Sequence, residues 1–183
     1  MKFLVHLIPA LILVWSASVS GSVSAADRAI EDFFGEYVGK SLTHTGAGVT
    51  PRDINVTIKP AKRGFSVDWK TGTTRADGTI KRKSYFIQFR KTKRENIFQS
   101  AMKKDVFGKL SPMNPMRGNP YVWARIHGDT LSVYAMHIVE NGSYEMQVYH
   151  RTLTATGMDL KFSRYREGEN LRDITGSARK ISK

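Results

Sequence analysis

The side chains best suited to binding chemistry gather in one stretch of the sequence, between Tyr121 and Tyr165. In a strand, alternate residues share a face, so Tyr121, Trp123 and Arg125 would project together. Aromatic side chains interleaved with a cation are typical of an apolar pocket with a few polar anchors. If Arg125 points inward, its guanidinium would hold a carboxylate or a phosphate through paired hydrogen bonds. The alternative is that Tyr121 and Trp123 fill a solid interior while Arg125 faces solvent.

Two further runs in this stretch, 131–137 and 144–150, have the same mixture of apolar residues with a histidine on one face. Such an interior would suit a small amphipathic or anionic ligand. The residues that we predict to bind it share aromatic, thioether or cationic character: Tyr37, Trp69, Trp123, Arg125, Tyr134, Met146 and His150.

Catalytic patterns are weak in the sequence. No serine lies in a Gly-x-Ser-x-Gly elbow, and the few acidic residues of the stretch do not form the pair that glycoside hydrolysis needs. His127, His137 and His150 lie on neighbouring runs, which leaves open a metal or acid–base cluster. No close histidine spacing supports that cluster, and a lone strand histidine is more often a hydrogen-bonded structural residue. We therefore predict a protein that is not an enzyme and uses no metal or cofactor.

Tight turns between strands would position these side chains. Gly128-Asp129, Asn141-Gly142 and Thr156-Gly157 separate runs that are rich in strand-forming residues. Asn-Gly between alternating apolar runs is a strong hairpin signal, because both residues tolerate positive φ. The sequence therefore predicts a meander of four antiparallel strands over residues 121–165.

Similar alternation extends through the rest of the chain, in runs at 33–45, 52–60, 65–70, 80–91, 97–102 and 169–181. Short connections and the lack of a long helical pattern favour an all-β fold, a single antiparallel up-and-down β-barrel of about eight to ten strands. Two turns of helix at Ala26–Phe33 would precede it. A β-sandwich is the alternative, but it needs more long connections than the one at 105–120. A barrel of this size leaves room for a small ligand.

The stretch from Asp105 to Asn119 interrupts this rhythm with prolines, glycines and methionines. A loop of this length in a compact domain is either functional or mobile. We predict that it forms a lid over the pocket, with four apolar contacts: Phe107, Leu110, Met113 and Met116. The Met-x-x-Met pair within it would also suit Cu(I), although adaptable apolar contacts are the commoner role of loop methionines.

The N-terminus has the organisation of a secretory signal peptide. Lys2 precedes a 13-residue apolar segment at 3–15, and small residues at 16–25 predict cleavage before Ala26. The apolar segment is shorter than the roughly 20 residues of a spanning helix, which disfavours an uncleaved membrane anchor. The chain has no cysteine, which excludes disulfides and a cysteine-linked lipid anchor. We predict a signal peptide at 1–25 and a single β-barrel domain at 26–183 in a bacterial periplasm.

The mature chain would be strongly basic, with 28 Lys and Arg against 16 Asp and Glu, a net charge of +12. The cations cluster at 59–63, 81–83, 90–94 and 103–104. For an exported protein, anionic lipid, lipopolysaccharide or a small anionic ligand is a more accessible partner than nucleic acid. The alternative function is therefore a basic module that docks on the anionic envelope or an acidic protein and has no internal ligand. The charge would otherwise be a solvated face that keeps strand edges from pairing.

A short helical segment, then a glycine-rich first strand carrying Gly35-Glu36-Tyr37, then an up-and-down meander resembles the calycin superfamily, which includes the lipocalins. That resemblance implies an aromatic ring on the first strand, covered at the closed end of the barrel by a cation from a late strand. Tyr37 would replace the family's tryptophan, and Arg164 or Arg151 would be the cation. The mature chain also resembles a class of uncharacterised exported proteins of Gram-negative bacteria, which implies no particular activity.

Overall fold

The computed structural model describes residues 26–45, 48–75, 77–100, 103–104, 110–111 and 113–182. The predicted signal peptide at 1–25 lies outside these residues. Among the residues described, no helix is long and apolar enough to cross a membrane.

Ten strands form one closed antiparallel barrel, and almost every pair of neighbours around it is also adjacent in sequence. These strands are β1 (Gly35–Thr45), β2 (Gly48–Ala61), β3 (Gly64–Thr74), β4 (Ile80–Lys91), β5 (Ile97–Ser100), β8 (Tyr121–His127), β9 (Thr130–Ile138), β10 (Tyr144–Leu153), β11 (Gly157–Arg166) and β12 (Glu169–Ser182). Pairing of β1 with β12 closes the barrel. The all-β, up-and-down barrel predicted from the sequence is confirmed, and the sandwich alternative is excluded.

The long connection between β5 and β8 carries two short strands and a single helical turn. β6 (Lys103–Lys104) pairs with β7 (Leu110–Ser111), and the 3₁₀ turn η2 (Pro115–Arg117) follows. The sheet is weakly paired next to this connection: β5 pairs with β4 through three residue pairs and with β8 through three.

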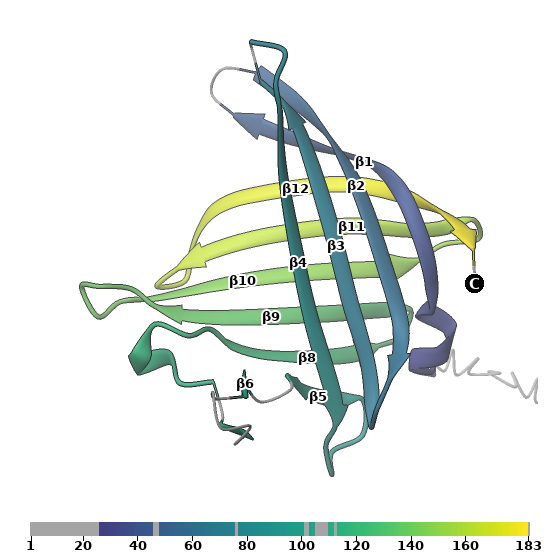
Figure 1. Cartoon of the computed structure of the whole chain (residues 1–183), viewed down its shortest axis with the longest axis vertical. Coiled ribbons are helices and arrows are strands. Elements are labelled where there is room, and N and C mark those ends of the chain that lie inside the picture. Colours follow the sequence, from purple (N-terminus) through teal and green to yellow (C-terminus); the bar gives the residue numbers. More distant parts are fainter. Residues whose placement is uncertain are drawn as a thin grey trace, which may run out of the picture.

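The strands form two walls that cross steeply, with β1 to β4 upright and β8 to β12 running across them in Figure 1. Alternate residues of each strand point inward. Ile58 and Phe65 of the first wall and Leu131 and Val133 of the second are all fully buried in one core cluster. This cluster fills part of the interior, and a cavity occupies another part.

The segment before β1 packs against one end of the barrel. Within residues 26–34, the part of this segment that the structure describes, the only helical element is the 3₁₀ turn η1 (Ile30–Phe33), whose Ile30 and Phe33 are buried. The predicted two-turn helix at Ala26–Phe33 is therefore wrong over its first half. The cause is that Asp27 and Arg28 bind the β8–β9 turn instead: Asp27 Oδ1 accepts from the Gly128 amide at 2.6 Å, and Arg28 Nε donates to Asp129 at 2.7 Å.

Candidate functional site

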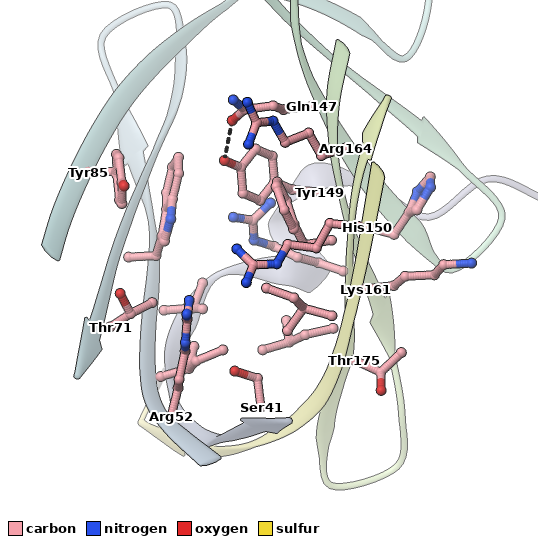
Figure 2. A pocket seen from close by; sticks show the side chains of 18 of the residues that line it. Ser41, Arg52, Thr71, Tyr85, Gln147, Tyr149, His150, Lys161, Arg164 and Thr175 are labelled. Carbon is pink, nitrogen blue, oxygen red and sulfur yellow. Dashed lines mark hydrogen bonds between the residues drawn. The ribbon is translucent and has the colours of Figure 1, made fainter. Parts of the chain in front are cut away.

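A cavity of about 260 Å³ lies between the two walls of the barrel. Side chains from β2, β3 and β4 line one side, and side chains from β10, β11 and β12 line the other. Figure 2 shows Arg52, Tyr149 and Arg164 directed into this space from opposite sides. The period of two along each strand aims one residue in two at the cavity.

Arg151 is the most deeply buried cation of the cavity, at 3% exposure. Its guanidinium carbon lies 5.3 Å from the ring centre of Trp69 and 5.9 Å from that of Tyr149. Two of its nitrogens, Nε and Nη1, are buried with no hydrogen-bond partner. Burial lowers the pKa of Arg151 to about 10, so the side chain is still charged at neutral pH. A buried charge without a counter-ion is strongly unfavourable, and the donors of Arg151 are therefore free for an anion.

Other cations line the cavity, and no carboxylate of the described residues lines it with them. Arg52, Lys83, Arg164 and Arg172 all contribute to its surface. Of these, Arg164 is neutralised by Glu145, whose Oε2 lies 2.6 Å from Nη2. The cavity therefore carries an excess of positive charge in surroundings where charges act more strongly than in water.

A hydrogen-bonded chain fixes the side of the cavity formed by β10 and β11. Tyr149 donates its hydroxyl proton to Gln147 Oε1 at 2.9 Å (Figure 2). Gln147 Nε2 in turn donates to Glu145 Oε1 at 3.0 Å. The hydrogen bond from Arg164 is the main reason why the pKa of Glu145 falls to about 2. Burial raises the pKa of Tyr149 to about 12. Around neutral pH, Glu145 therefore stays ionised and Tyr149 stays neutral. The hydrogen bonds hold the side chains of Tyr149, Gln147 and Glu145 in one orientation.

Aromatic rings supply an apolar surface beside these cations. Trp69 stacks on Tyr85 with ring centres 5.0 Å apart and 17° between the planes, and its ring also lies 5.3 Å from Tyr149. Tyr149 in turn contacts Phe162 at 4.8 Å. Flat rings next to guanidinium groups suit a ligand with an apolar body and an anionic group.

Of the residues predicted to bind a ligand, Trp69 lines the cavity and Tyr37 does not. Tyr37 is buried at the η1 end, where its hydroxyl donates to the Phe33 carbonyl at 2.9 Å. The cation that covers its ring is Lys180 of β12, at 5.5 Å. The assignment of this role to Arg164 or Arg151 was wrong, because both belong to the cavity.

Four further candidates lie on the outer face of the barrel and do not line the cavity: Trp123, Arg125, Tyr134 and Met146. His150 contributes to the lining of the cavity, but its ring points outward. On β8 it is Val122, Ala124 and Ile126 that are buried in the core, so Arg125 is exposed on the opposite face. Of the two orientations that the sequence left open for Arg125, the structure has the one that faces solvent, away from the cavity.

The other outward-facing candidates make contacts among themselves or with neighbouring strands. Trp123 stacks on Tyr134 with ring centres 5.0 Å apart. His150 Nδ1 lies 2.7 Å from Ser132 Oγ, and Figure 2 shows this ring pointing away from the cavity. Met146 alternates with the inward-facing residues of β10 and so shares the outer face.

The predicted lid residues are placed only in part. Phe107 lies outside the described residues, and Leu110 is described in its backbone alone. Met113 is half-buried beside η2, and Met116 is 81% exposed. Neither methionine lines the cavity. The lid remains a prediction.

Two of the three histidines that could have formed a cluster have separate partners. His127 is exposed and lies 3.3 Å from Asp27 at the end where η1 packs, and His150 contacts Ser132. Among the described residues, no group of three or more potential ligands from His, Cys, Asp and Glu is close enough to hold a metal ion.

Sequence reasoning did not predict Arg52, Tyr149, Arg151 or Arg172 as ligand-binding residues, although it named Arg151 for another role, the cation over Tyr37. The available signal was the alternation on β10, in which Tyr149 and Arg151 share a face with Glu145 and Gln147. That face is the more polar of the two, which is the pattern of a solvent-facing surface and not of an interior.

Neither models of known protein families nor the curated proteins gave a match to this chain. The closed ten-stranded antiparallel barrel with an interior cavity is compatible with a calycin-like or lipocalin-like fold.

Proposed function

We propose that the protein is an exported, non-catalytic β-barrel that binds a small anionic, amphipathic ligand in its interior. The observation that carries the proposal is the buried guanidinium of Arg151, which has two nitrogens without hydrogen-bond partners. A group of this kind destabilises the empty protein. A bound carboxylate or phosphate would supply both the missing charge and the missing acceptors.

The walls of the cavity support the amphipathic character of the ligand. Trp69, Tyr85, Tyr149 and Phe162 form a connected set of rings next to the cations. An aromatic or aliphatic body would bury apolar area against them, which contributes about 25 cal/mol per Å². Export, which rests on the targeting features of residues 1–25, would place the protein in the periplasm.

The alternative, a basic module that docks on an anionic surface, would use the outward-facing cations. Part of the positive charge faces the cavity instead, through Arg52, Lys83, Arg151 and Arg172. This distribution favours binding in the interior over binding at the surface.

Titration with 8-anilinonaphthalene-1-sulfonate, a fluorescent aromatic anion, tests the proposal on three proteins. The wild type should bind the probe saturably, with one molecule per chain. Arg151→Met should weaken binding by about tenfold or more, because a charge-assisted hydrogen bond contributes about 1.5–3 kcal/mol. Arg125→Met removes an equivalent charge from the outer face and should change affinity by less than about twofold.

Equal binding by the wild type and Arg151→Met would contradict interior binding. If Arg125→Met weakened binding as much as Arg151→Met, the alternative of a basic module that docks on an anionic surface would gain support. Both arginines would then act only through the overall positive charge of the protein.

A further inference from the structure

The outer side of the barrel over β8 to β11 carries two rows of apolar side chains. Residues that are paired across neighbouring strands lie side by side. One row crosses four strands and consists of Tyr121, Met136, Met146 and Tyr165. The next row along the strands consists of Trp123, Tyr134 and Val148. All of these residues alternate with residues that fill the core or line the cavity, so they share the outer side of the sheet. We call them the outer apolar face.

The aromatic rings of the outer apolar face contact one another and are open to solvent. Trp123 stacks on Tyr134 with 12° between the ring planes, and the ring centre of Tyr121 lies 5.8 Å from that of Trp123. Tyr121 is 49% exposed, and Trp123 and Tyr134 are partly exposed. Single exposed apolar residues are ordinary, but contiguous rows of them on the outside of a domain mark an interaction site.

A third row borders this face and is basic. It consists of Arg125, Ser132, His150 and Lys161. Arg125 and Lys161 are exposed at its two ends, and neither forms an ion pair with a described residue. None of the three rows has an acidic residue on β8 to β11. The surface therefore offers apolar contact and positive charge together.

This combination of charge and apolar rings decides which partner fits. A second copy of the chain would bring the same basic row and the same net charge of +12, from 28 Lys and Arg against 16 Asp and Glu in the mature chain. Repulsion between like charges therefore opposes self-association. An anionic bilayer complements both parts of the surface, because Trp and Tyr favour the boundary between headgroups and acyl chains and Lys and Arg favour anionic headgroups.

We infer that the outer apolar face docks on the surface of an anionic phospholipid bilayer. The rings of Trp123 and Tyr134 lie at the boundary between headgroups and acyl chains, and Arg125 and Lys161 contact lipid phosphates. This docking is additional to the proposed interior binding and uses none of the cavity's cations. It holds the barrel at a surface into which amphipathic molecules partition.

Sedimentation of the mature protein with lipid vesicles tests the inference. The wild type should bind vesicles of equal parts phosphatidylcholine and phosphatidylglycerol about tenfold or more tightly than vesicles of phosphatidylcholine alone. Added salt should weaken this binding, because it screens exposed charges.

Matched variants locate the docking surface. Trp123→Thr/Tyr134→Thr should weaken binding to the anionic vesicles about tenfold or more, because it removes two rings that the bilayer would bury. Phe86→Thr removes an exposed ring from β4 and should change binding by less than about twofold. Threonine suits an outward strand position, so these variants should fold. Tyr121→Thr, which should weaken binding by a smaller factor, provides an independent readout.

A charge pair gives a second comparison. Lys161→Gln should weaken binding about fivefold, the effect expected for one cation beside an anionic surface. Lys70→Gln removes an exposed cation from β3, on the opposite wall of the barrel, and should change binding by less than about twofold.

Tryptophan fluorescence reports which face meets the lipid. Without the predicted signal peptide the chain has two tryptophans, Trp69 in the cavity and Trp123 on the outer apolar face. Anionic vesicles whose phosphatidylcholine is brominated on the acyl chains should quench the wild type. Trp123→Phe keeps a ring at this position and should still bind, but its remaining Trp69 is 7% exposed and should not be quenched.

Three results would overturn the inference: no preference for anionic vesicles, equal loss of binding in Phe86→Thr and Trp123→Thr/Tyr134→Thr, or bound wild type without quenching. A stable dimer that Trp123→Thr/Tyr134→Thr dissociates would also overturn it, because the face would then be an interface between copies. Interior binding predicts none of these results, so each of the two proposals can fail while the other stands.

Discussion

At the scale of single residues, a guanidinium inside a barrel raises the free energy of the folded state unless something neutralises it. Removing such a group from water costs several kcal/mol. The contacts of Arg151 with the rings of Trp69 and Tyr149 return only about 2 kcal/mol. The part of this cost that the ring contacts do not offset lowers the stability of the empty protein, and a bound anion would restore it. Binding sites commonly reduce the stability of the unliganded protein in this way.

Arg151→Met should therefore raise the free energy of unfolding of the ligand-free protein by about 1 kcal/mol or more, because methionine fills much of the same volume without a charge. Urea denaturation measures this difference. The control Arg125→Met, on the outer surface, should stay within about 0.5 kcal/mol of the wild type. A clear loss of stability in Arg151→Met would mean that Arg151 holds the fold together and does not wait for a ligand.

At the scale of the elements, the shape of the cavity depends on how closely β1 and β12 approach. Gly39 is paired with Ala178, and a Cβ at Gly39 would overlap the carbonyl oxygen of Ser177. Gly176 has a similar restriction from Lys40 and Ser41. The small residues of the glycine-rich first strand therefore allow the two ends of the sheet to pair and close the barrel.

Gly39→Ala should destabilise the protein by about 3 kcal/mol, because the backbone of β12 must move to make room for the added methyl group. Gly72→Ala is the matched control: its Cβ would meet nothing closer than 3.6 Å, from Ile80, so the fold should tolerate it. Thermal unfolding of both variants checks this. Equal melting temperatures would show that the β1–β12 contact is not close enough to matter.

The elements also show what the sequence could and could not predict. The Gly128 and Asn141-Gly142 turns, with φ of 54° at Gly128 and 83° at Gly142, followed from local residue preferences. Alternation likewise gave the strands and the sets of residues that share a face.

Which face points inward did not follow in β10. On β8 the more apolar face, with Val122, Ala124 and Ile126, does point inward, whereas we predicted the aromatic face instead. Local pattern favours the more apolar face as the interior, but β10 turns Glu145, Gln147 and Arg151 inward, where Gln147 and Arg151 line the cavity. Trp123 and Tyr134 stack on the outside instead. That Arg52, Arg151 and Arg172 line one cavity depends on pairings around the whole barrel, which no local pattern contains.

At the scale of the whole molecule, one end of the barrel is filled by side chains and the interior beside it contains a cavity. The η1 end is filled by residues such as Phe33 and is fastened by the contacts of Asp27 and Arg28 with the β8–β9 turn. The interior between the walls keeps a cavity that is rich in cations. A solid core at one end and a charged cavity beside it are what a binding protein needs to remain folded while empty.

The most direct measurement is native mass spectrometry of the mature protein purified from the cells that make it, with Arg151→Met and Arg125→Met purified in parallel. Interior binding predicts that the wild type and Arg125→Met carry the same small molecule, which organic extraction releases, and that Arg151→Met does not. Retention of that molecule by Arg151→Met, or a wild type that carries nothing, would contradict the binding of an anion at Arg151.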